Sequence, residues 1–491
     1  MPCRAGDIAR SESRSTAAQA MNLIDRLQDP QLVAEFQHLF GVRRKDRERD
    51  ARGGAAERLE AAGASSENLL GRYLGEQECQ NGVASRRSCQ HLSVPDARHK
   101  THFRQGSTAS VASDCSTGSG RSLMERLLGE NTGGTEGSMG EEEDGGGNGQ
   151  AQVEGRDFEI NNRFWYHLFS LATALGGELF YSIFFCFWAW NVDGAVLRRV
   201  IVIWMITMYI GQALKDILKV PRPACPPVVR LDPKWALEYG LPSTHAMVGA
   251  AMPFSILILT LSRYQLDWGW GLAIATTWCL LVCLSRLYLG MHSVLDIVCG
   301  LVLVTGLLVL ILPWVDVLDH LALTHPASPL LTITLTIAMV VCYPATDRWT
   351  PARGDTTVIV GVGCGSLLGS WLNYQVGVTR EPTLAPPYTV IWPTLNMAGL
   401  SLLRTILGLV VIVAVKAIFK ALSFATICAL LQVKAEDYVN KSGSLTSRHR
   451  LIVELFYKFI TYIAIGFTIV YTGPLAFRLI GIERPTFYTE V

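Results

Sequence analysis

Long apolar runs alternate with short polar connections from about residue 164 onward. Most of these runs hold the ~20 apolar residues that a helix needs to cross a bilayer. Proline and glycine clusters separate them, as is typical of loops. The pattern predicts an all-α fold, a polytopic transmembrane helical bundle of about nine spans. The expected spans are residues 165–190, 197–217, 244–262, 268–288, 293–314, 327–343, 355–374, 397–420 and 456–477.

Residues 1–157 have a different pattern, polar and of low complexity. Such a composition buries too little apolar surface to offset chain entropy, so we expect this N-terminal region to be largely disordered. The exception is a short amphipathic helix near 30–40, where Asp29-Pro30 offers an N-cap and a first-turn proline. This helix is expected to lie on the membrane surface or to dock onto the transmembrane body. A second short helix is predicted from Ser122.

Composition supports an integral membrane protein over a soluble one. The chain has 491 residues, 49% of them hydrophobic, and a positive mean hydropathy of +0.27. Its net charge of +1 gives no electrostatic argument for a nucleic-acid partner. Twelve cysteines are scattered without a CxxC pair or a Cys/His cluster, so neither a metal site nor a disulfide framework is expected. The start of the chain lacks the apolar core of a cleavable signal peptide.

Three polar clusters interrupt the apolar pattern. The first and second lie in the connection between the second and third expected spans, and the third lies between the fourth and fifth. Two membrane crossings separate these connections, so the topology brings all three clusters to one face. The clusters are Lys215 with Arg222-Pro223; Pro242-Ser243-Thr244-His245; and Ser285-Arg286 with His292 and Asp296.

The cations of these clusters predict an anion site. Lys215, Arg222 and Arg286 carry three permanent positive charges, and burying them unpaired would cost several kcal/mol. The carboxylates visible nearby, Asp216 and Asp296, are too few to neutralise them. A phosphate monoester, with nearly two negative charges and three acceptor oxygens, fits. Contacts with lipid headgroups or signals for membrane orientation would explain one such cation, but not the set together with two histidines.

The two histidines have the placement that phosphoryl transfer requires. His292 and Asp296 are four residues apart on an expected helix and therefore share one face. A carboxylate on one imidazole nitrogen leaves the other free to attack phosphorus. His245 lies beside an expected helix start, where free backbone N–H groups favour an anion, and it suits a general acid.

The pattern K-x6-RP, PSxH, SR-x5-H-x3-D resembles the type 2 phosphatidic acid phosphatase superfamily. Thr244 stands where many members have glycine. Glu238-Tyr239 before the second motif and Ala246-Met247 after it resemble the sphingosine-1-phosphate phosphatase branch. Further segments carry the same likeness: residues 26–31, 177–181, 282–286 and 353–356.

This resemblance implies a metal-independent phosphoric monoester hydrolase without a cofactor. The implied reaction hydrolyses sphingosine 1-phosphate and related long-chain base phosphates through a phosphohistidine. His292 would be the nucleophile, Asp296 its orienting carboxylate and His245 the acid and base. The implied membrane phosphatase domain is 158–491, with its catalytic core at about 197–315, in the endoplasmic reticulum membrane. The implied phosphate-binding residues are Lys215, Arg222, Ser243, Thr244, Ser285 and Arg286.

Two alternatives stay open at this point. A related lipid phosphatase of the same superfamily, acting on phosphatidate or a polyprenyl phosphate, would have the same motifs. A transporter with a charged vestibule would require polar residues along the membrane midplane, whereas most of the expected spans are apolar. The sequence does not fix the oligomeric state, for which a homo-oligomer is one candidate.

Glu178 and the membrane orientation are further open points. An acid inside the first span is costly unless paired or protonated. It is interpreted either as a hydrogen-bond partner of a neighbouring helix or as a contact for the amine of a long-chain base. The basic connection after the eighth span indicates a cytosolic active site, whereas Arg198 and Arg199 indicate the opposite.

Overall fold

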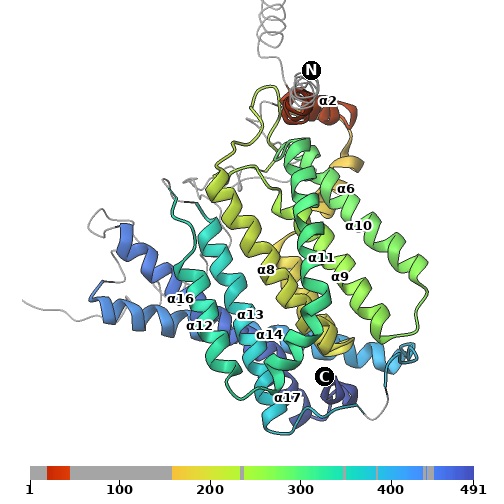
Figure 1. Ribbon diagram of the computed structural model, residues 1–491, viewed down its shortest axis with the longest axis vertical. Helices are drawn as coiled ribbons and strands as arrows, with labels where there is room; N and C mark the ends of the chain where they lie inside the picture. The colour runs from red at the N-terminus through yellow and green to blue at the C-terminus, as the bar shows by residue number, and fades with distance from the viewer. Residues whose placement is uncertain are drawn as a thin grey trace, which may run out of the picture. The chain divides into compact units, whose positions relative to one another are not determined.

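The computed structural model describes residues 19–44, 158–232, 237–346, 350–382, 385–434, 438 and 447–490. The helix predicted from Ser122 lies outside these residues. Across the described segments the fold is helical, apart from a two-stranded sheet of β1 (Val42–Arg44) and β2 (Phe158–Ile160) and one isolated bridge. The helices, shown in Figure 1, are α2 Pro30–Leu39, α6 Arg163–Ala174, α7 Glu178–Asn191, α8 Gly194–Leu218, α9 Thr244–Arg263, α10 Trp268–Tyr288, α11 Val294–Thr324, α12 Ser328–Val341, α13 Ala352–Gln375, α14 Leu395–Leu431, α16 Ser447–Phe467 and α17 Gly473–Leu479, with short turns η2 Thr468–Thr472 and η3 Pro485–Thr489.

Each of the nine expected spans contains apolar helix, and the expected all-α membrane fold is confirmed. Seven of the described helical segments are long and apolar enough to cross a membrane, and the bent pair α6–α7 raises the number to eight. The remaining expected span is α12, which has only 14 residues. That length gives about 21 Å, short of the ~30 Å hydrocarbon core.

The first expected span is a broken helix. The axes of α6 and α7 differ by 58°, and the break falls at Gly176-Gly177. A Cβ at Gly176 would lie 3.1 Å from Cδ2 of His245 and 3.3 Å from Cγ1 of Val282. The small residue therefore allows the broken segment to approach α9 and α10 closely.

Four helix ends meet at one end of the bundle. α8 and α10 end there, and α9 and α11 begin there. The N–H of Ser243 before α9 donates to the carbonyl of Asp296 in α11 at 3.0 Å, which ties two of these ends together. α8 and α9 are the two most enclosed of these four helices, with 72% and 61% of their apolar windows buried.

Close packing of α13 on α16 explains the glycines at 361 and 365, and close packing of α13 on Met205 of α8 explains Gly363. A Cβ at Gly365 would lie 2.0 Å from the carbonyl oxygen of Ile463, and one at Gly361 would lie 3.0 Å from that of Phe459. These glycines pack helices together, as small residues do in membranes. A nucleotide-binding loop is not needed to explain them.

The helix α2 docks onto the membrane body at the site end, with Asp29 as its N-cap. Gln37 is buried, and its amide donates to the carbonyls of Val229 at 2.6 Å and Tyr288 at 2.9 Å. The N–H of Val229 donates back to Gln37 Oε1 at 2.9 Å. A polar side chain with three such bonds fixes the position of this helix.

Arg198 and Arg199 have partners within the fold. Arg198 Nε lies 2.6 Å from Asp319 Oδ1, and Arg199 Nε lies 2.8 Å from Asp316 Oδ1, at the end of α8 opposite the site. These ion pairs account for the two arginines without a signal for membrane orientation. α16 runs parallel to α13, since Gly354, Gly361 and Gly365 of α13 face Glu454, Phe459 and Ile463 of α16 in the same order.

Candidate active site

The three polar clusters meet at one end of the bundle, as the topology predicts. Arg222 and His292 come from the connections, and the other side chains come from the helix ends. Each of them is at most 9% exposed except His245, which is half-buried. The helix-end residues are Lys215 in α8; Ser243, Thr244 and His245 at the start of α9; Ser285 and Arg286 in α10; and Asp296 in α11.

The imidazole of His292 is held between a carboxylate and a guanidinium. Its Nδ1 lies 3.5 Å from Asp296 Oδ2, a separation slightly longer than a hydrogen bond. Its Nε2 lies 3.3 Å from Arg222 Nη1. A capping box fixes the carboxylate, since Ser293 N donates to Asp296 Oδ2 at 2.8 Å. The ring therefore presents Nε2 to the cations.

The electrostatics of this end favour a neutral His292. Burial lowers the pKa of His292 well below its usual range, and the charges of nearby cations, Arg222 first, lower it further. The charge of His245 contributes in the same direction, so the two imidazoles are electrostatically coupled. At neutral pH the lone pair on Nε2 is available to attack an electrophile.

Lys215 and Arg222 already face a carboxylate. Lys215 Nζ donates to Glu238 Oε2 at 2.8 Å and to Thr244 Oγ1 at 2.9 Å. Arg222 Nη2 lies 3.7 Å from the same Glu238 oxygen, and Arg222 Nη1 donates to the Met291 carbonyl at 2.7 Å. Sequence reasoning used Glu238 only for family likeness and missed it as a site residue. A loop glutamate has no periodicity that would place it there.

Arg286 has unused hydrogen-bond donors. It is fully buried, and its Nη1 donates to Thr173 Oγ1 at 3.2 Å. Its Nε and Nη2 have no hydrogen-bond partner in the described chain. Buried N–H groups without partners are rare, so these two are available for an anion.

Ser285 is connected to Arg286 through Thr173. Its hydroxyl donates to the Val282 carbonyl at 2.6 Å and lies 2.8 Å from Thr173 Oγ1. Thr173 therefore links Ser285 to Arg286, and it positions the guanidinium. Nothing in the sequence pattern singled out Thr173, because it belongs to α6 and reaches the site only through the helix packing.

His245 and the start of α9 complete the site. Ser243 is the N-cap of α9, and its hydroxyl accepts a hydrogen bond from Ala246 N at 3.4 Å. His245 is in the first turn, against the glycine break between α6 and α7. The first amides of α9 point toward this end, where a helix N-terminus favours an anion.

Asp216 and Glu178, the two other carboxylates considered from the sequence, have the following surroundings in the structure. Asp216 accepts a hydrogen bond from Tyr343 OH at 2.9 Å, so it pairs with the connection from α12 to α13. Glu178 is the first residue of α7, at the break within the first expected span, and its side chain is exposed on the protein surface. It interacts electrostatically with Asp355 and Lys416.

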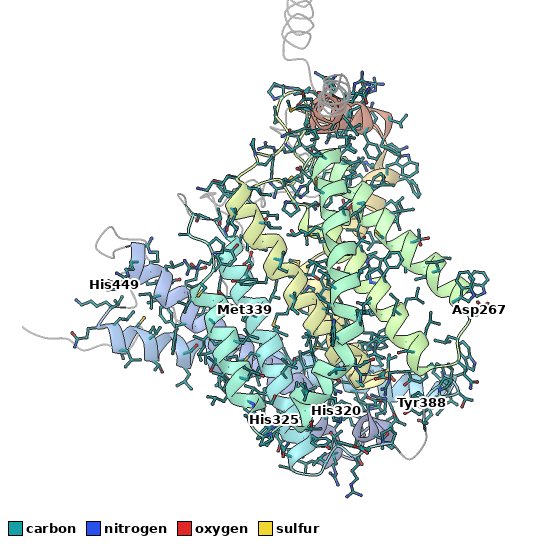
Figure 2. The ribbon with its side chains drawn as sticks, in the orientation of Figure 1. Asp267, His320, His325, Met339, Tyr388 and His449 are labelled. Atoms are coloured by element: carbon teal, nitrogen blue, oxygen red, sulfur yellow. The ribbon has the colours of Figure 1, made fainter. Side chains whose placement is uncertain are left out.

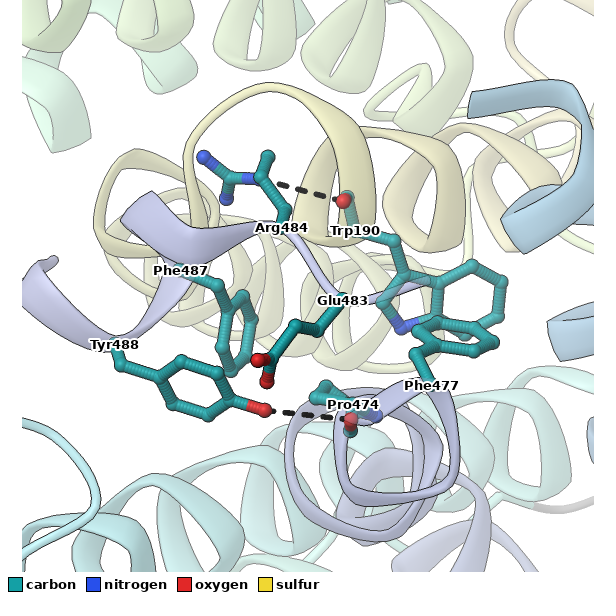
Figure 3. A pocket seen from close by; sticks show the side chains of 7 residues that line it. All are labelled: Trp190, Pro474, Phe477, Glu483, Arg484, Phe487 and Tyr488. Carbon is teal, nitrogen blue, oxygen red and sulfur yellow. Dashed lines mark hydrogen bonds between the residues drawn. The ribbon is translucent and has the colours of Figure 1, made fainter. Parts of the chain in front are cut away.

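His320, His325 and a small cavity lie away from this end. His320 and His325 lie at the opposite end of α11, as Figure 2 shows. The cavity beneath the C-terminal segment, shown in Figure 3, has a volume of about 10 Å³. Such a volume holds at most one water molecule. Arg484 and Tyr488 there bond to main-chain oxygens of Trp190 and Pro474 and so close the C-terminal segment onto α7 and α17.

Comparisons with known proteins agree with this geometry. The model of the PAP2 superfamily matches residues 196–319, which contain all the motif residues. The chain is 34% identical to sphingosine-1-phosphate phosphatase 1 of Mus musculus over 470 residues, covering 94% of this chain and 98% of that protein. It is 39% identical to sphingosine-1-phosphate phosphatase 2 of Mus musculus, covering 67% of this chain and 92% of that protein. Lipid phosphate phosphatase delta of Arabidopsis thaliana is 31% identical over 40% of this chain and 49% of its own length. No solved structure matches the chain significantly.

Proposed function

The chain belongs to the sphingosine-1-phosphate phosphatase family of the PAP2 superfamily, and we propose on this premise that it hydrolyses sphingosine 1-phosphate. Related long-chain base phosphates belong to the same proposal. The products are the sphingoid base and inorganic phosphate, and the enzyme is a membrane-embedded phosphoric monoester hydrolase. The observation that carries the proposal is the 3.3 Å separation of Arg222 Nη1 from His292 Nε2, beside the unpaired N–H groups of Arg286.

The first chemical step transfers the phosphoryl group to His292. The lone pair on Nε2 forms a bond to phosphorus while the bond from phosphorus to the sphingoid oxygen breaks. His245, as an imidazolium, gives its proton to the leaving oxygen. Asp296 stabilises the positive charge that develops on the His292 ring, because it faces Nδ1.

The second step releases phosphate. His245, now neutral, takes a proton from water, whose oxygen attacks phosphorus and breaks the bond to Nε2. The site then returns to its initial state with phosphate as the product. Lys215, Arg222 and Arg286 compensate the charge on the phosphoryl oxygens in both steps, and Ser243, Thr244 and Ser285 complete the binding site. Since fixed cations supply this charge, the mechanism includes no metal.

Glu178 is proposed to meet the amine of the substrate. It is exposed at the first turn of α7, two residues from the glycine that contacts His245. An ammonium two carbons from the phosphate ester is within reach of a carboxylate beside the leaving-group acid. This arrangement distinguishes a long-chain base phosphate from a phosphatidate, which has no such amine.

The test is phosphate release by purified protein in detergent micelles with a chelator present. We expect turnover of sphingosine 1-phosphate, and a loss of about 10³-fold or more in His292→Ala. His320→Ala, at the opposite end of α11, serves as the matched control and is expected to retain activity. A label on the wild-type protein that is stable in base and labile in acid would identify the phosphohistidine.

Two results would contradict the proposal. Loss of activity with chelator would overturn the metal-free mechanism. Faster turnover of phosphatidate or a polyprenyl phosphate than of sphingosine 1-phosphate would assign the same chemistry to another lipid.

Residence in the endoplasmic reticulum membrane is part of the proposal, because the family resemblance implies it. Co-localisation of a tagged full chain with a marker of that membrane tests it. A homo-oligomer is retained as the hypothesis for assembly, to be tested by light scattering of the purified protein in detergent.

A further inference from the structure

The buried carboxylate of Glu238 lies inside the proposed phosphoryl site. The residue is 4% exposed, in the connection between α8 and α9. Its Oε2 lies 2.8 Å from Lys215 Nζ and 3.7 Å from Arg222 Nη2, and its main-chain carbonyl accepts a hydrogen bond from Arg222 Nε at 3.0 Å. Both cations that it contacts are among those assigned to the phosphoryl group. A mechanism based on the histidines and cations does not use this carboxylate.

The cations of the site are therefore unequal. Lys215 and Arg222 contact Glu238 as a counter-anion. Arg286 interacts with Asp232 and Glu238 only electrostatically, and two of its buried N–H groups have no hydrogen-bond partner in the described chain. The second carboxylate oxygen, Oε1 of Glu238, is also buried and without a hydrogen-bond partner in the described chain. A buried acceptor left unsatisfied is costly, and in this position it repels any anion bound alongside.

The charge of the site matches one phosphate monoester only when Glu238 is counted. The three cations and a protonated His245 carry four positive charges, which Glu238 and Asp296 reduce to two. Arg230 and Asp232, which also interact electrostatically with Arg222, carry opposite charges and cancel in this count. A phosphate monoester carries nearly two negative charges at neutral pH, so its complex is close to neutral. A diphosphate carries more negative charge and would leave the complex negative in a poorly solvated place.

We propose that Glu238 is an internal counter-anion that fixes the specificity of the site. It limits the net positive charge of the site to the amount that balances a monoester dianion. It also lowers the affinity of the site for inorganic phosphate and for diphosphates. This inference rests on the proposed phosphatase function. Glu238 acts through Lys215 and Arg222, and is thus a positioning and specificity residue and not a catalytic one.

The experiment compares inhibition by inorganic phosphate in the wild type and Glu238→Gln. The glutamine keeps the size and a carbonyl oxygen for Lys215 but removes the charge. We expect the inhibition constant of phosphate to fall about tenfold or more, and the ratio of diphosphate to monoester hydrolysis to rise. Glu454→Gln is the control, because it removes another partly buried carboxylate, which pairs with Lys458 at 2.8 Å in α16. The control is expected to leave the inhibition constant unchanged.

Structural damage weakens binding, so the expected fall in the inhibition constant cannot come from damage to the site. An unchanged or higher inhibition constant in a folded Glu238→Gln variant would overturn the inference. If the Glu238→Gln variant does not fold, the inference is tested on the wild-type protein by comparing inhibition by pyrophosphate and by phosphate. Pyrophosphate should then inhibit no more strongly than phosphate, and inhibition about tenfold stronger would overturn the inference. If the wild type does not hydrolyse sphingosine 1-phosphate, calorimetric binding of inorganic phosphate to the same variants still tests Glu238. Failure of the two proposals is thus distinguishable.

Discussion

The backbone N–H of Ser243 donates to the carbonyl oxygen of Asp296 at 3.0 Å. This bond joins the start of α9, which carries His245, to the start of α11, whose Asp296 faces His292. A Cβ at Gly300 would lie 2.9 Å from the Ser243 carbonyl, so only glycine lets the two helix starts approach this closely. The relative position of the two imidazoles therefore depends on a glycine without functional groups.

The substitution Gly300→Ala is expected to lower kcat about tenfold or more, because small displacements of reacting groups are costly. Gly306→Ala is the matched control on the same helix, since a Cβ there meets nothing within 4 Å. Steady-state kinetics on both variants is the measurement. Equal activities would show that the close approach is unnecessary for catalysis.

Asp296→Asn is expected to lower kcat by about 10²- to 10⁴-fold with little change in KM, because the amide no longer stabilises the imidazolium. Acid-quenched single turnovers should show slower formation of the phosphoenzyme. A variant with a raised KM and unchanged kcat would instead assign Asp296 to substrate binding.

Arg286→Lys is expected to lower kcat/KM about tenfold or more, although the charge is kept. The lysine has no planar fork to replace the two free N–H groups of Arg286. Arg404→Lys is the control, since Arg404 bonds to the Ile482 carbonyl at 2.6 Å near the C-terminal segment. Similar losses in the two variants would argue for a general effect on folding.

The pH dependence of phosphoenzyme formation should show no ionisation of His292 near pH 6.5. Burial and neighbouring cations lower the pKa of His292, so its neutral form persists as the pH falls through about 6.5, the ordinary value for histidine. The measurement is kcat/KM against pH, with the titration of the substrate phosphate determined by phosphorus NMR. The acid limb should follow the substrate alone. A further acid limb, with a midpoint at or above pH 6.5, would contradict the lowered pKa of His292.

Glu178→Gln is expected to raise KM for sphingosine 1-phosphate several-fold more than KM for a phosphatidate, because only the first carries an ammonium group. The two substrates are compared in the same mixed micelles. Equal changes in KM for the two substrates would show that Glu178 does not recognise the amine and would leave it only a structural role at the helix break.

Topology explains how much of the site sequence reasoning predicted. Counting crossings was enough to bring Lys215, His245 and His292 to one end, because each crossing reverses the chain. Asp216 shows where such reasoning fails. Successive helix residues are turned by about 100°, so the neighbour of Lys215 faces a different helix and bonds to Tyr343. Glu238 lies in the long connection between α8 and α9, and the hydrophobic periodicity of the sequence does not predict where such a connection runs.

The break in the first span was unpredictable for a related reason. Residues 165–190 are largely apolar, and two glycines alone do not fix a bend of 58°. The bend follows from contact of Gly176 with His245, a tertiary relation. The glycines at 361–365, by contrast, are surrounded by apolar residues, a pattern that indicates helix packing from the sequence alone.

The three hydrogen bonds of Gln37 mean that the smallest active unit is discontinuous in sequence. A protein trimmed to start at residue 158 would retain every catalytic side chain. It would nevertheless leave the carbonyls of Val229 and Tyr288 unpaired at the catalytic end. Residues 29–41 must accompany the membrane body, even as a separately supplied peptide, for the loop before His292 to keep its shape.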